Sequence, residues 1–422
     1  MMRNMLIMDS VGAHRRCRGK IEITPKCDIT GYEDLSVWYT PGVADACMAI
    51  KKNREEVFEL TNRWNTLAIV TDGTRVLGLG DIGPEAALPV MEGKALLFKY
   101  LGGIDAVPIC LKTRNADEIV RAAEMLAPSF GGINLEDIES PKCFHILDRL
   151  RTESEMPVWH DDQQGTATAV VAGLMNALKV TGRRVEDARI VIVGAGAAGV
   201  AIERLLPEMG VDEGKIIVTD VRGILSRDRR DLEGNPYARA ICERTNREQI
   251  SGGIARAVKG ADAVIAVSAP GAVKREHIAL MNDDAIVFAM ANPVPEIMPE
   301  EARGAGAAIV ATGRSDFENQ INNSLVFPAV FRGVFDVRAS RITDEMCISA
   351  ARALADFAGE RGLSRHYIMP RMDEDEAFVR EATTVGMEAM REGVARLSFD
   401  YDELHSICKE IIDGAKRRIR RR

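Results

Sequence analysis

Aromatic residues, long apolar runs and an excess of basic charge are scarce or missing in this 422-residue chain. Phe, Trp and Tyr together make up 5% of the residues. No apolar run approaches the roughly 18–20 residues that a membrane-spanning helix needs, so we expect no association with a membrane. The formal net charge of -8 argues against a nucleic-acid binder, which needs a basic face.

The eight cysteines stand singly, without a C-x-x-C pair or the spacing of a zinc site. This pattern predicts free, reduced thiols, which persist in the cytoplasm. The N-terminal segment has only a brief apolar stretch at residues 5–8, followed by His14 and three arginines. Because that stretch is too short for a secretory signal peptide, we expect a cytoplasmic protein.

Short apolar stretches alternate with helical patterns along two successive parts of the chain. The first part predicts helices at 88–100 and 116–126, and strands at 66–70, 106–111, 132–135 and 157–159. In the second part, a helix that is apolar nearly all round, at 166–180, is expected to be buried. The strands predicted after it are at 189–193, 215–219, 263–267, 285–290 and 307–311.

The alternation of strand and helix indicates mainly parallel sheets covered by helices. A chain of 422 residues also exceeds what one hydrophobic core usually supports. We therefore predict an α/β protein with an N-terminal α/β domain at residues 1–160 and a Rossmann-type, doubly wound parallel sheet at 161–370. C-terminal helices at 371–422 are expected to pack back on the first domain.

A glycine-rich loop follows the predicted strand at 189–193. Its six residues, Gly194, Ala195, Gly196, Ala197, Ala198 and Gly199, match G-x-G-x-x-G. The next predicted strand leads to an acidic residue, Asp220, about 20 residues further on. This context predicts a dinucleotide site, with the pyrophosphate at the helix N-terminus. Asp220 favours NAD because it repels a 2′-phosphate, but Arg222 could offset that repulsion, so NADP stays open.

Two acidic pairs follow two neighbouring predicted strands. Glu136 and Asp137 come after the strand at 132–135, and Asp161 and Asp162 come after the strand at 157–159. Either pair alone reads equally well as solvated or helix-capping residues. Because the carboxyl ends of parallel strands converge, the two pairs together favour a site for Mg²⁺ or Mn²⁺, which prefer oxygen ligands.

Three further strings lie upstream of these carboxylates. Residues 36–44 form an unusual turn-forming string, and residues 71–83 are dense in glycine, as in a loop that a ligand approaches. Lys94 lies within a largely apolar predicted helix. A lone lysine in that setting more often extends to solvent than serves as a base.

With these strings in place, the chain resembles the malic enzyme family, specifically its short bacterial and archaeal type. The strings that carry the resemblance run in the family's order, from about Gly19 to Asp336. They are YTPGVA (39–44), TDGTRVLGLGDIG (71–83), MEGKALLFK (91–99), INLEDI (133–138), WHDDQQGTA (159–167), GAGAAG (194–199), ANPVPE (291–296) and NQINNSLVFP (319–328).

The resemblance implies oxidation of L-malate to pyruvate and CO₂ with NAD or NADP and Mg²⁺ or Mn²⁺. By position it makes Lys94 the general base, Asp161 the neighbour that helps to set its protonation, and Tyr39 the general acid that protonates C3. It further implies a homodimer, with Tyr39 contributed across the interface. The remaining roles are metal ligation by Glu136, Asp137 and Asp162, malate binding by Arg75, Asn292 and Asn323, and dinucleotide binding by the glycine loop, Asp220, Arg222, Ser268 and Asn292.

Some residues depart from the family's pattern, and rival functions remain. Gln164 stands where short bacterial members commonly carry His, and Val37 and Trp38 precede Tyr39 where small or aliphatic residues are more usual. His160 is expected to be structural. The alternatives are a malolactic enzyme that makes lactate, a catalytically silent dinucleotide-binding regulator, and an amino-acid or folate dehydrogenase, which would not need the paired carboxylates.

Overall fold

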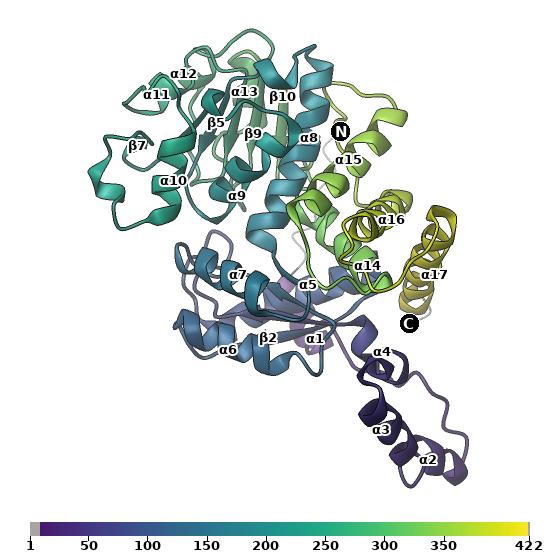
Figure 1. Cartoon of the computed structure of the whole chain (residues 1–422). Coiled ribbons are helices and arrows are strands. Elements are labelled where there is room, and N and C mark those ends of the chain that lie inside the picture. The colour runs from purple at the N-terminus through teal and green to yellow at the C-terminus, as the bar shows by residue number, and fades with distance from the viewer. Residues whose placement is uncertain (1–8, 421–422) are drawn as a thin grey trace.

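The computed structural model describes residues 9–420. Residues 1–8, part of the segment in which we expect no signal peptide, lie outside the described residues. A first parallel sheet occupies the lower half of the molecule in Figure 1, with strand order β2-β1-β3-β4. Its strands lie within about two residues of the predicted positions: β1 (Thr66–Thr71), β2 (Asp105–Cys110), β3 (Gly132–Leu135) and β4 (Val158–His160).

Helices cover both faces of this sheet, because its strands alternate two sets of apolar side chains. Ala68, Val70 and Ile133 pack under α6 (Ala116–Leu126) and α7 (Lys142–Glu153). Leu67 and Ile69 on the opposite face pack with α5 (Pro84–Gly102). Helix α5 begins four residues before its predicted start, with Pro84 at a first-turn position that needs no N–H.

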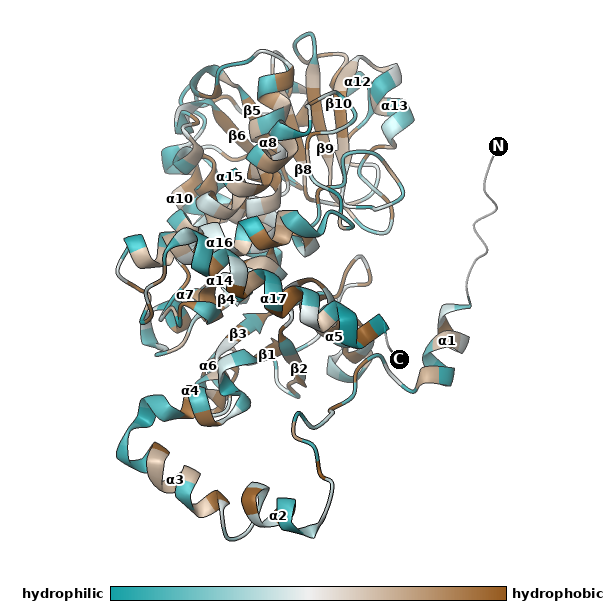
Figure 2. Ribbon diagram, turned by 90° about the vertical axis from the view of Figure 1, so that its right-hand side faces the viewer, coloured by the Kyte–Doolittle hydropathy of each residue, from teal (hydrophilic) through white to brown (hydrophobic). Residues whose placement is uncertain are grey.

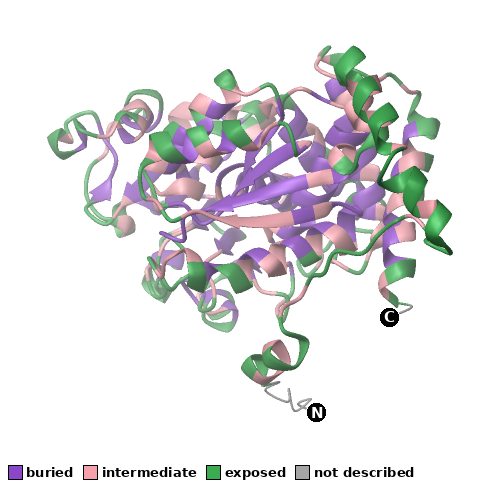
Figure 3. Ribbon diagram, turned by 90° about the horizontal axis from the view of Figure 1, so that it is seen from below, coloured by how far each residue is buried: buried purple, intermediate pink, exposed green. Residues whose placement is uncertain are grey.

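A second sheet of six strands forms the upper half, in the order β10-β9-β8-β5-β6-β7, and most of the strands in the molecule are buried (Figures 1 and 3). All neighbours are parallel except β6 and β7, the one departure from the predicted topology. The strands are β5 (Ile190–Val193), β6 (Ile216–Asp220), β7 (Gly223–Ile224), β8 (Ala263–Ala266), β9 (Ala285–Ala289) and β10 (Ala307–Thr312).

Helices lie on both faces of the second sheet, so it is a Rossmann-type, doubly wound sheet as predicted. One face packs with α8 (Thr166–Val180), α9 (Ala197–Leu205) and α10 (Pro236–Arg244). The other packs with α11 (Ile254–Ala257), α12 (Arg275–Ile278) and α13 (Pro299–Gly304). Helix α8 is buried over most of its length, which agrees with its all-round apolar sequence.

Four C-terminal helices join the two sheets on one side of the molecule: α14 (Phe327–Asp336), α15 (Asp344–Glu360), α16 (Asp375–Arg391) and α17 (Tyr401–Arg420). Helices α14 and α17 approach α5 so closely that a Cβ at Gly102 would lie 2.5 Å from the Pro328 carbonyl oxygen. A Cβ at Gly103 would likewise lie 2.7 Å from the Ile411 side chain. No helix in residues 9–420 is long and apolar enough to cross a membrane.

The N-terminal residues form an arm that projects from the body (Figures 1 and 2). It carries α2 (Tyr32–Trp38) and α3 (Val43–Lys52), while α1 (Ser10–Cys17) precedes it and α4 (Val57–Leu60) connects it to the first sheet. The string at 36–44, which we expected to be a turn, is the end of one helix, a short turn and the start of the next. Neither α2 nor α3 buries a residue within the chain.

Candidate active site

The two acidic pairs meet where β3 and β4 end side by side. These strands are parallel neighbours, with Leu135 opposite His160, so the residues that follow them emerge at one edge of the sheet. Oxygen atoms of Glu136, Asp137 and Asp162 all lie within 4.8 Å of one another. This is the arrangement that both pairs together predicted.

The local backbone holds these carboxylates in place. Asp137 adopts a left-handed conformation, with φ of 53°, and its N–H donates to Oδ2 of Asp162 at 2.9 Å. Asn134 donates to Glu136 at 2.9 Å. On the β4 side, Asp161–Gly165 form one π-helical turn, η3, directly before α8. Such turns are rare in proteins overall, and those that occur are often found at functional sites.

Glu136 and Asp137 are buried, Asp162 is partly exposed, and the three carboxylates lie too close together to ionise independently. Burial, together with the neighbouring Asp162, raises the pKa of Asp137 to about 8. Burial also raises the pKa values of Glu136 and Asp162. Oδ2 of Asp137 is buried and has no hydrogen-bond partner. Three convergent carboxylates with an unused oxygen fit a hard divalent cation, which would replace the hydration that they have lost.

Lys94 points from α5 into this carboxylate cluster, and its side chain is only 10% exposed. Its Nζ lies 2.5 Å from Asp161 Oδ2, 3.0 Å from Glu136 Oε1 and 4.4 Å from the centre of the Phe327 ring. The ammonium group therefore does not extend to solvent, as a lone helical lysine more often does. Burial alone would lower its pKa, but Asp161 and Glu136 outweigh burial and hold the pKa above its ordinary value.

His160 and Gln164 support the turn that carries Asp161 and Asp162. Gln164 Oε1 accepts the His160 N–H at 3.0 Å, which ties the end of β4 to the turn. The His160 ring is fully buried, neither ring nitrogen has a hydrogen-bond partner, and burial lowers its pKa to about 4. A neutral, enclosed ring agrees with the structural role expected for His160.

The glycine-dense loop at 71–83 lies across the cluster. Asp72 Oδ1 accepts from the Thr74 hydroxyl at 2.6 Å, and the Arg75 N–H donates to the Asp137 carbonyl at 3.0 Å. The Arg75 side chain is exposed. A Cβ at Gly78 would lie 2.8 Å from the Asn292 carbonyl oxygen, so this loop contacts the turn that follows β9.

The structure places the two expected substrate asparagines at this same edge. Asn323 opens the short helix η8 (Asn323–Leu325), and its Cβ lies 3.1 Å from where a Cβ at Gly165 would be. Gly165 ends the π-helical turn of Asp161. The backbone of Asn292 lies against Gly78, in the loop at 71–83. Arg75, Asn292 and Asn323 thus come from three separate segments, and none of them hydrogen-bonds to another. The Asn292 amide nitrogen lies against Gly313, 2.7 Å from where a Cβ there would be.

The glycine loop has the geometry of a dinucleotide site. Gly194 has a φ of 121°, and a Cβ there would lie 2.5 Å from the Val267 carbonyl oxygen. A Cβ at Gly199 would lie 1.8 Å from the Gly194 carbonyl oxygen. Gly196, in contrast, faces open space, where a pyrophosphate can approach. Ser268 lies beside Gly194, and its buried hydroxyl has no partner.

Two residues that the sequence analysis did not single out hold this region. Glu296 accepts the Ser268 N–H at 2.6 Å and the Ala291 N–H at 2.9 Å, which joins the loops after β8 and β9. Arg229 donates to both oxygens of Asp220, at 3.1 and 2.7 Å, and to Asp231. The ANPVPE string contains Glu296, but no spacing signal pointed to Arg229.

Arg222 and Tyr39 differ from what their positions suggested. Arg222 pairs with Asp231 at 3.1 Å, and only its backbone N–H contacts Asp220, at 2.8 Å. Tyr39 lies on the projecting arm and is 70% exposed, so within one chain it does not join Lys94. Of the expected catalytic residues, the structure brings Lys94 and Asp161 together and leaves Tyr39 outside.

The chain matches two family models that together cover most of its length. "Malic enzyme, N-terminal domain" matches residues 18–117 and 113–151, and "Malic enzyme, NAD binding domain" matches residues 163–391. The chain belongs to the malic enzyme family. This confirms the resemblance on which the site residues were chosen, and the curated relatives agree with it.

Among curated malic enzymes, the bifunctional malic/malolactic enzyme of Bacillus subtilis is 46% identical over 94% of this chain and 96% of its own length. The NAD-dependent malic enzyme of Geobacillus stearothermophilus is 48% identical over 90% of this chain and 78% of its own. Among solved structures, the malic enzyme of Entamoeba histolytica superimposes with a TM-score of 0.94 at 44% identity, covering 97% of this chain and 87% of that one. Malic enzymes act on malate with NAD or NADP, so the chain is an oxidoreductase.

Proposed function

We propose that this malic enzyme converts L-malate to pyruvate and CO₂ while it reduces a nicotinamide dinucleotide. The observation that carries the proposal is the position of Lys94, which is buried against Asp161 beside three convergent carboxylates. The base and the cation site lie at one edge of the first sheet, and helix α9, which the dinucleotide loop opens, packs against the π-helical turn that carries Asp161 and Asp162. A silent regulator would need neither the lysine nor the carboxylates, and an amino-acid or folate dehydrogenase would not need the cation site.

In the first step, the Lys94 amine accepts the proton of the malate C2 hydroxyl while the hydride at C2 passes to the nicotinamide. Loss of CO₂ from the resulting β-keto acid leaves an enolate, and a proton delivered to C3 completes pyruvate. A divalent cation held by Glu136, Asp137 and Asp162 would supply electrophilic stabilisation of the oxygen at C2. The Lys94 ammonium then loses this proton while the general acid regains the one that it delivered to C3, so the turnover releases no net proton.

The carboxylates control whether Lys94 can act as a base. Asp161 and Glu136 hold the proton on its amine while their own charge is uncompensated. Once a cation neutralises the cluster, burial becomes the dominant influence, and it favours the neutral amine. Asp161 therefore has a dual role: it orients Nζ at 2.5 Å and helps to set its protonation.

Three polar residues around the cluster are proposed to bind malate. Arg75 offers a planar guanidinium that suits a carboxylate, and its exposed side chain leaves that group accessible. Asn292 and Asn323 are proposed to supply amide donors from two other segments of the chain. We further propose that residues 1–160 form the substrate domain, 161–370 the dinucleotide domain and 371–422 the helices that brace the first domain.

For the dinucleotide, the contacts of Asp220 favour NAD. Arg229 holds the carboxylate with both nitrogens of its fork, so the Asp220 side chain is fixed as an acceptor for ribose hydroxyls. Arg229 is held by both Asp220 and Asp231, so it is not free to bind a 2′-phosphate, whereas Arg222 is exposed and makes a single contact with Asp231. The glycine loop and Ser268 are proposed to bind the remainder of the dinucleotide.

We propose a homodimer in which the arm of one chain completes the site of the other with Tyr39. The arm exposes several large apolar side chains, including Tyr32, Val37, Trp38 and Met48. A second copy of this chain would cover them. Tyr39 would then deliver the proton to C3 in the partner's site, a role that its position in the single chain does not allow.

Complementation between variants tests this arrangement. Lys94→Ala and Tyr39→Phe are each inactivating, but a mixed dimer has one site with both residues intact if Tyr39 acts across the interface. Random mixing then restores about a quarter of the sites. Absence of any recovery in dimers that demonstrably exchange subunits would refute the exchange of Tyr39.

The reaction itself is tested by absorbance of the reduced nicotinamide with L-malate and Mn²⁺, separately with NAD and with NADP, and again after EDTA. We expect an absorbance increase with NAD that EDTA abolishes, together with pyruvate in the product. Lactate without accumulation of reduced dinucleotide would instead indicate the malolactic reaction. No product of either kind would refute both.

A further inference from the structure

Helix α7 covers the first sheet and presents one stripe of side chains to the helices of the second. Phe144, Asp148 and Arg151 follow the i, i+4, i+7 spacing of a single helix face. The start of α9 and Tyr237 of α10 pack against the apolar side chains around α7. None of the roles proposed above uses this stripe, although it joins helices that belong to different sheets.

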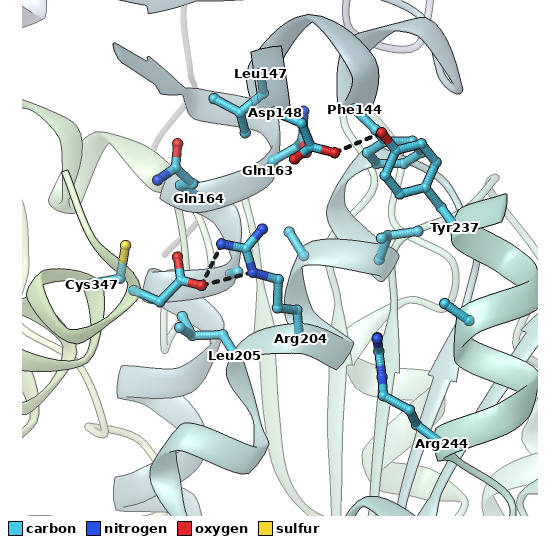
Figure 4. Close-up of a pocket in the computed structure, with 15 residues that line it drawn as sticks. Phe144, Leu147, Asp148, Gln163, Gln164, Arg204, Leu205, Tyr237, Arg244 and Cys347 are labelled. Carbon is cyan, nitrogen blue, oxygen red and sulfur yellow. Dashed lines mark hydrogen bonds and ion pairs between the residues drawn. The ribbon is translucent and has the colours of Figure 1, made fainter. Parts of the chain in front are cut away.

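The first contact across the stripe is made by Tyr237. Its hydroxyl donates to Asp148 Oδ2 at 2.7 Å, and its ring lies 4.6 Å from the centre of the Phe144 ring (Figure 4). Tyr237 is half-buried, and burial together with Asp148 raises the pKa of its hydroxyl, which therefore remains a donor near neutral pH. A single side chain thus makes both an apolar and a polar contact between α10 and α7.

The second contact is made by Asp344, the first residue of α15. It accepts from Arg151 Nη2 of α7 at 3.1 Å and from Arg204 Nε of α9 at 2.7 Å. Burial alone would raise the pKa of Asp344, but the two arginines hold it below its ordinary value, so the carboxylate is charged. The same carboxylate therefore joins α7 to a helix that covers the second sheet.

The apolar side chains beside these contacts leave a space. A cavity of about 150 Å³ is lined by residues of both contacts, including Asp148, Tyr237 and Asp344, and by the apolar Leu147 and Leu205. Protein interiors are usually packed so closely that few voids exceed a water molecule. Because apolar packing is incomplete here, we infer that the polar contacts at its margin fix the distance between α7 and the second sheet.

Helix α7 is also hydrogen-bonded to the turn that carries two of the active-site carboxylates. Gln163 directly follows Asp162 in this π-helical turn, and its Nε2 donates to the Cys143 carbonyl at 3.2 Å. Cys143 precedes Phe144, the residue on which the Tyr237 ring packs. A shift of α7 relative to the second sheet would therefore also displace the turn.

We propose that Tyr237 and Asp148 are positioning residues for hydride transfer, an inference that rests on the proposed function. Their hydrogen bond holds α7 against α10, and so sets the distance between the Lys94 cluster on the first sheet and the dinucleotide on the second. Hydride transfer is sensitive to this distance, because a misplacement of about 1 Å can reduce a rate by about 10²-fold. Neither residue is among those proposed to bind malate or the dinucleotide.

Steady-state kinetics of Tyr237→Phe, which loses the hydroxyl and keeps the ring, tests the proposal with L-malate, Mn²⁺ and NAD. We expect kcat to fall about ten-fold while both KM values change less than about two-fold. With malate deuterated at C2, the primary isotope effect should be at least as large as in the unmodified protein, because hydride transfer itself is slowed.

Variants of Asp148 identify the hydrogen bond as the cause. Asp148→Ala should lower kcat as Tyr237→Phe does, and the double variant should lose no more than either single variant, since all three lack the same bond. Asp148→Asn retains an acceptor oxygen for the hydroxyl and should keep kcat within about two-fold of the unmodified protein.

The matched control is Tyr367→Phe, which removes the hydroxyl of another half-buried tyrosine. That hydroxyl donates to Glu374 Oε2 at 3.0 Å, within the C-terminal part of the chain, so kcat should not change. The proposal is overturned if Tyr237→Phe lowers kcat no more than this control does. It is equally overturned if kcat falls with a smaller isotope effect, because a step other than hydride transfer is then slowed.

Hydrogen exchange of the same variants separates this inference from the proposed function. Amide exchange in α7 should be faster in Tyr237→Phe than in Tyr367→Phe, although Tyr237 belongs to α10. Unchanged exchange in α7 would overturn the inference even if kcat falls. An unmodified protein that does not oxidise malate would refute the proposed function, and exchange would still test whether Tyr237 holds α7.

Discussion

Asp137 makes the stability of the metal-free protein dependent on pH in a direction opposite to that of most acidic residues. Its pKa is about 8 in the folded chain, against an ordinary value of 3.8. Below pH 4 the carboxyl is protonated in both states. Between pH 4 and 8 the unfolded chain ionises while the folded chain stays protonated, so stability falls by about 1.4 kcal/mol per pH unit. Above pH 8 this loss is complete.

From pH 5 to pH 8 this single group therefore lowers the free energy of unfolding by about 4 kcal/mol. At about 2 °C per kcal/mol, the Tm falls by about 8 °C. The assay is thermal unfolding of EDTA-treated protein across this range, compared with Asp137→Asn. The variant should lose about 1.4 kcal/mol per pH unit from the slope of stability against pH. Mn²⁺ should raise the Tm of the unmodified protein at pH 8 and have much less effect on the variant.

A matched control is Glu124→Gln, which removes a carboxylate from the exposed face of α6 and should leave the slope unchanged. The reasoning is refuted if Asp137→Asn and the unmodified protein show parallel stability curves between pH 5 and 8. That result would mean that the Asp137 carboxyl is ionised in the folded, metal-free chain. Burial and the neighbouring Asp162 would then not suffice to keep this carboxyl protonated without a bound cation.

Three further changes test other contacts. Lys94→Ala should reduce the rate of malate oxidation by about 10²–10⁴-fold, the usual contribution of a general base, while NADH binding measured by fluorescence persists. Normal turnover would exclude Lys94 as the base. Asp220→Ser frees Arg229 and should shift the ratio of kcat/KM values at least ten-fold toward NADP, and an unchanged ratio would contradict the proposed role of that ion pair. Arg332→Ala leaves the buried Asp336 unpaired and should lower the free energy of unfolding by denaturant by about 3–5 kcal/mol. Arg371→Ala, at an exposed pair, should lower it by less than about 1 kcal/mol, and equal losses would show that the burial of Arg332 does not matter.

Strands and the glycine loop could be predicted from the sequence because their signals are local. Each buried strand is a short apolar run, and the loop is defined by glycines at fixed spacing. The contact between Lys94 and Asp161 has no such signal, since it joins two elements 67 residues apart. The raised pKa of Lys94 has no local signal either, because the acidic neighbours that raise it come from other elements.

The arm and the contacts of Asp220 are two other features that could not be predicted from the sequence. Helices α2 and α3 bury no residue in the single chain, and the Pro41-Gly42 pair between them favours a turn, although Val43, Ala46, Cys47 and Ile50 share one face of α3. Arg229 reaches Asp220 from a neighbouring loop, and only the fold brings the two together. The left-handed backbone of Asp137 is similarly imposed by its surroundings, because Asp has no intrinsic need for it.

The contact between Gly78 and Asn292 bears on the timing of the catalytic cycle. A Cβ at Gly78 would lie 2.8 Å from the Asn292 carbonyl oxygen, so the loop at 71–83, which carries Arg75, cannot move away from the turn after β9 without parting this contact. If parting is the slow event, turnover should decrease as solvent viscosity rises, and a primary deuterium isotope effect on hydride transfer should be masked. The absence of one methyl group would thus help to determine how fast the enzyme can release what it has made.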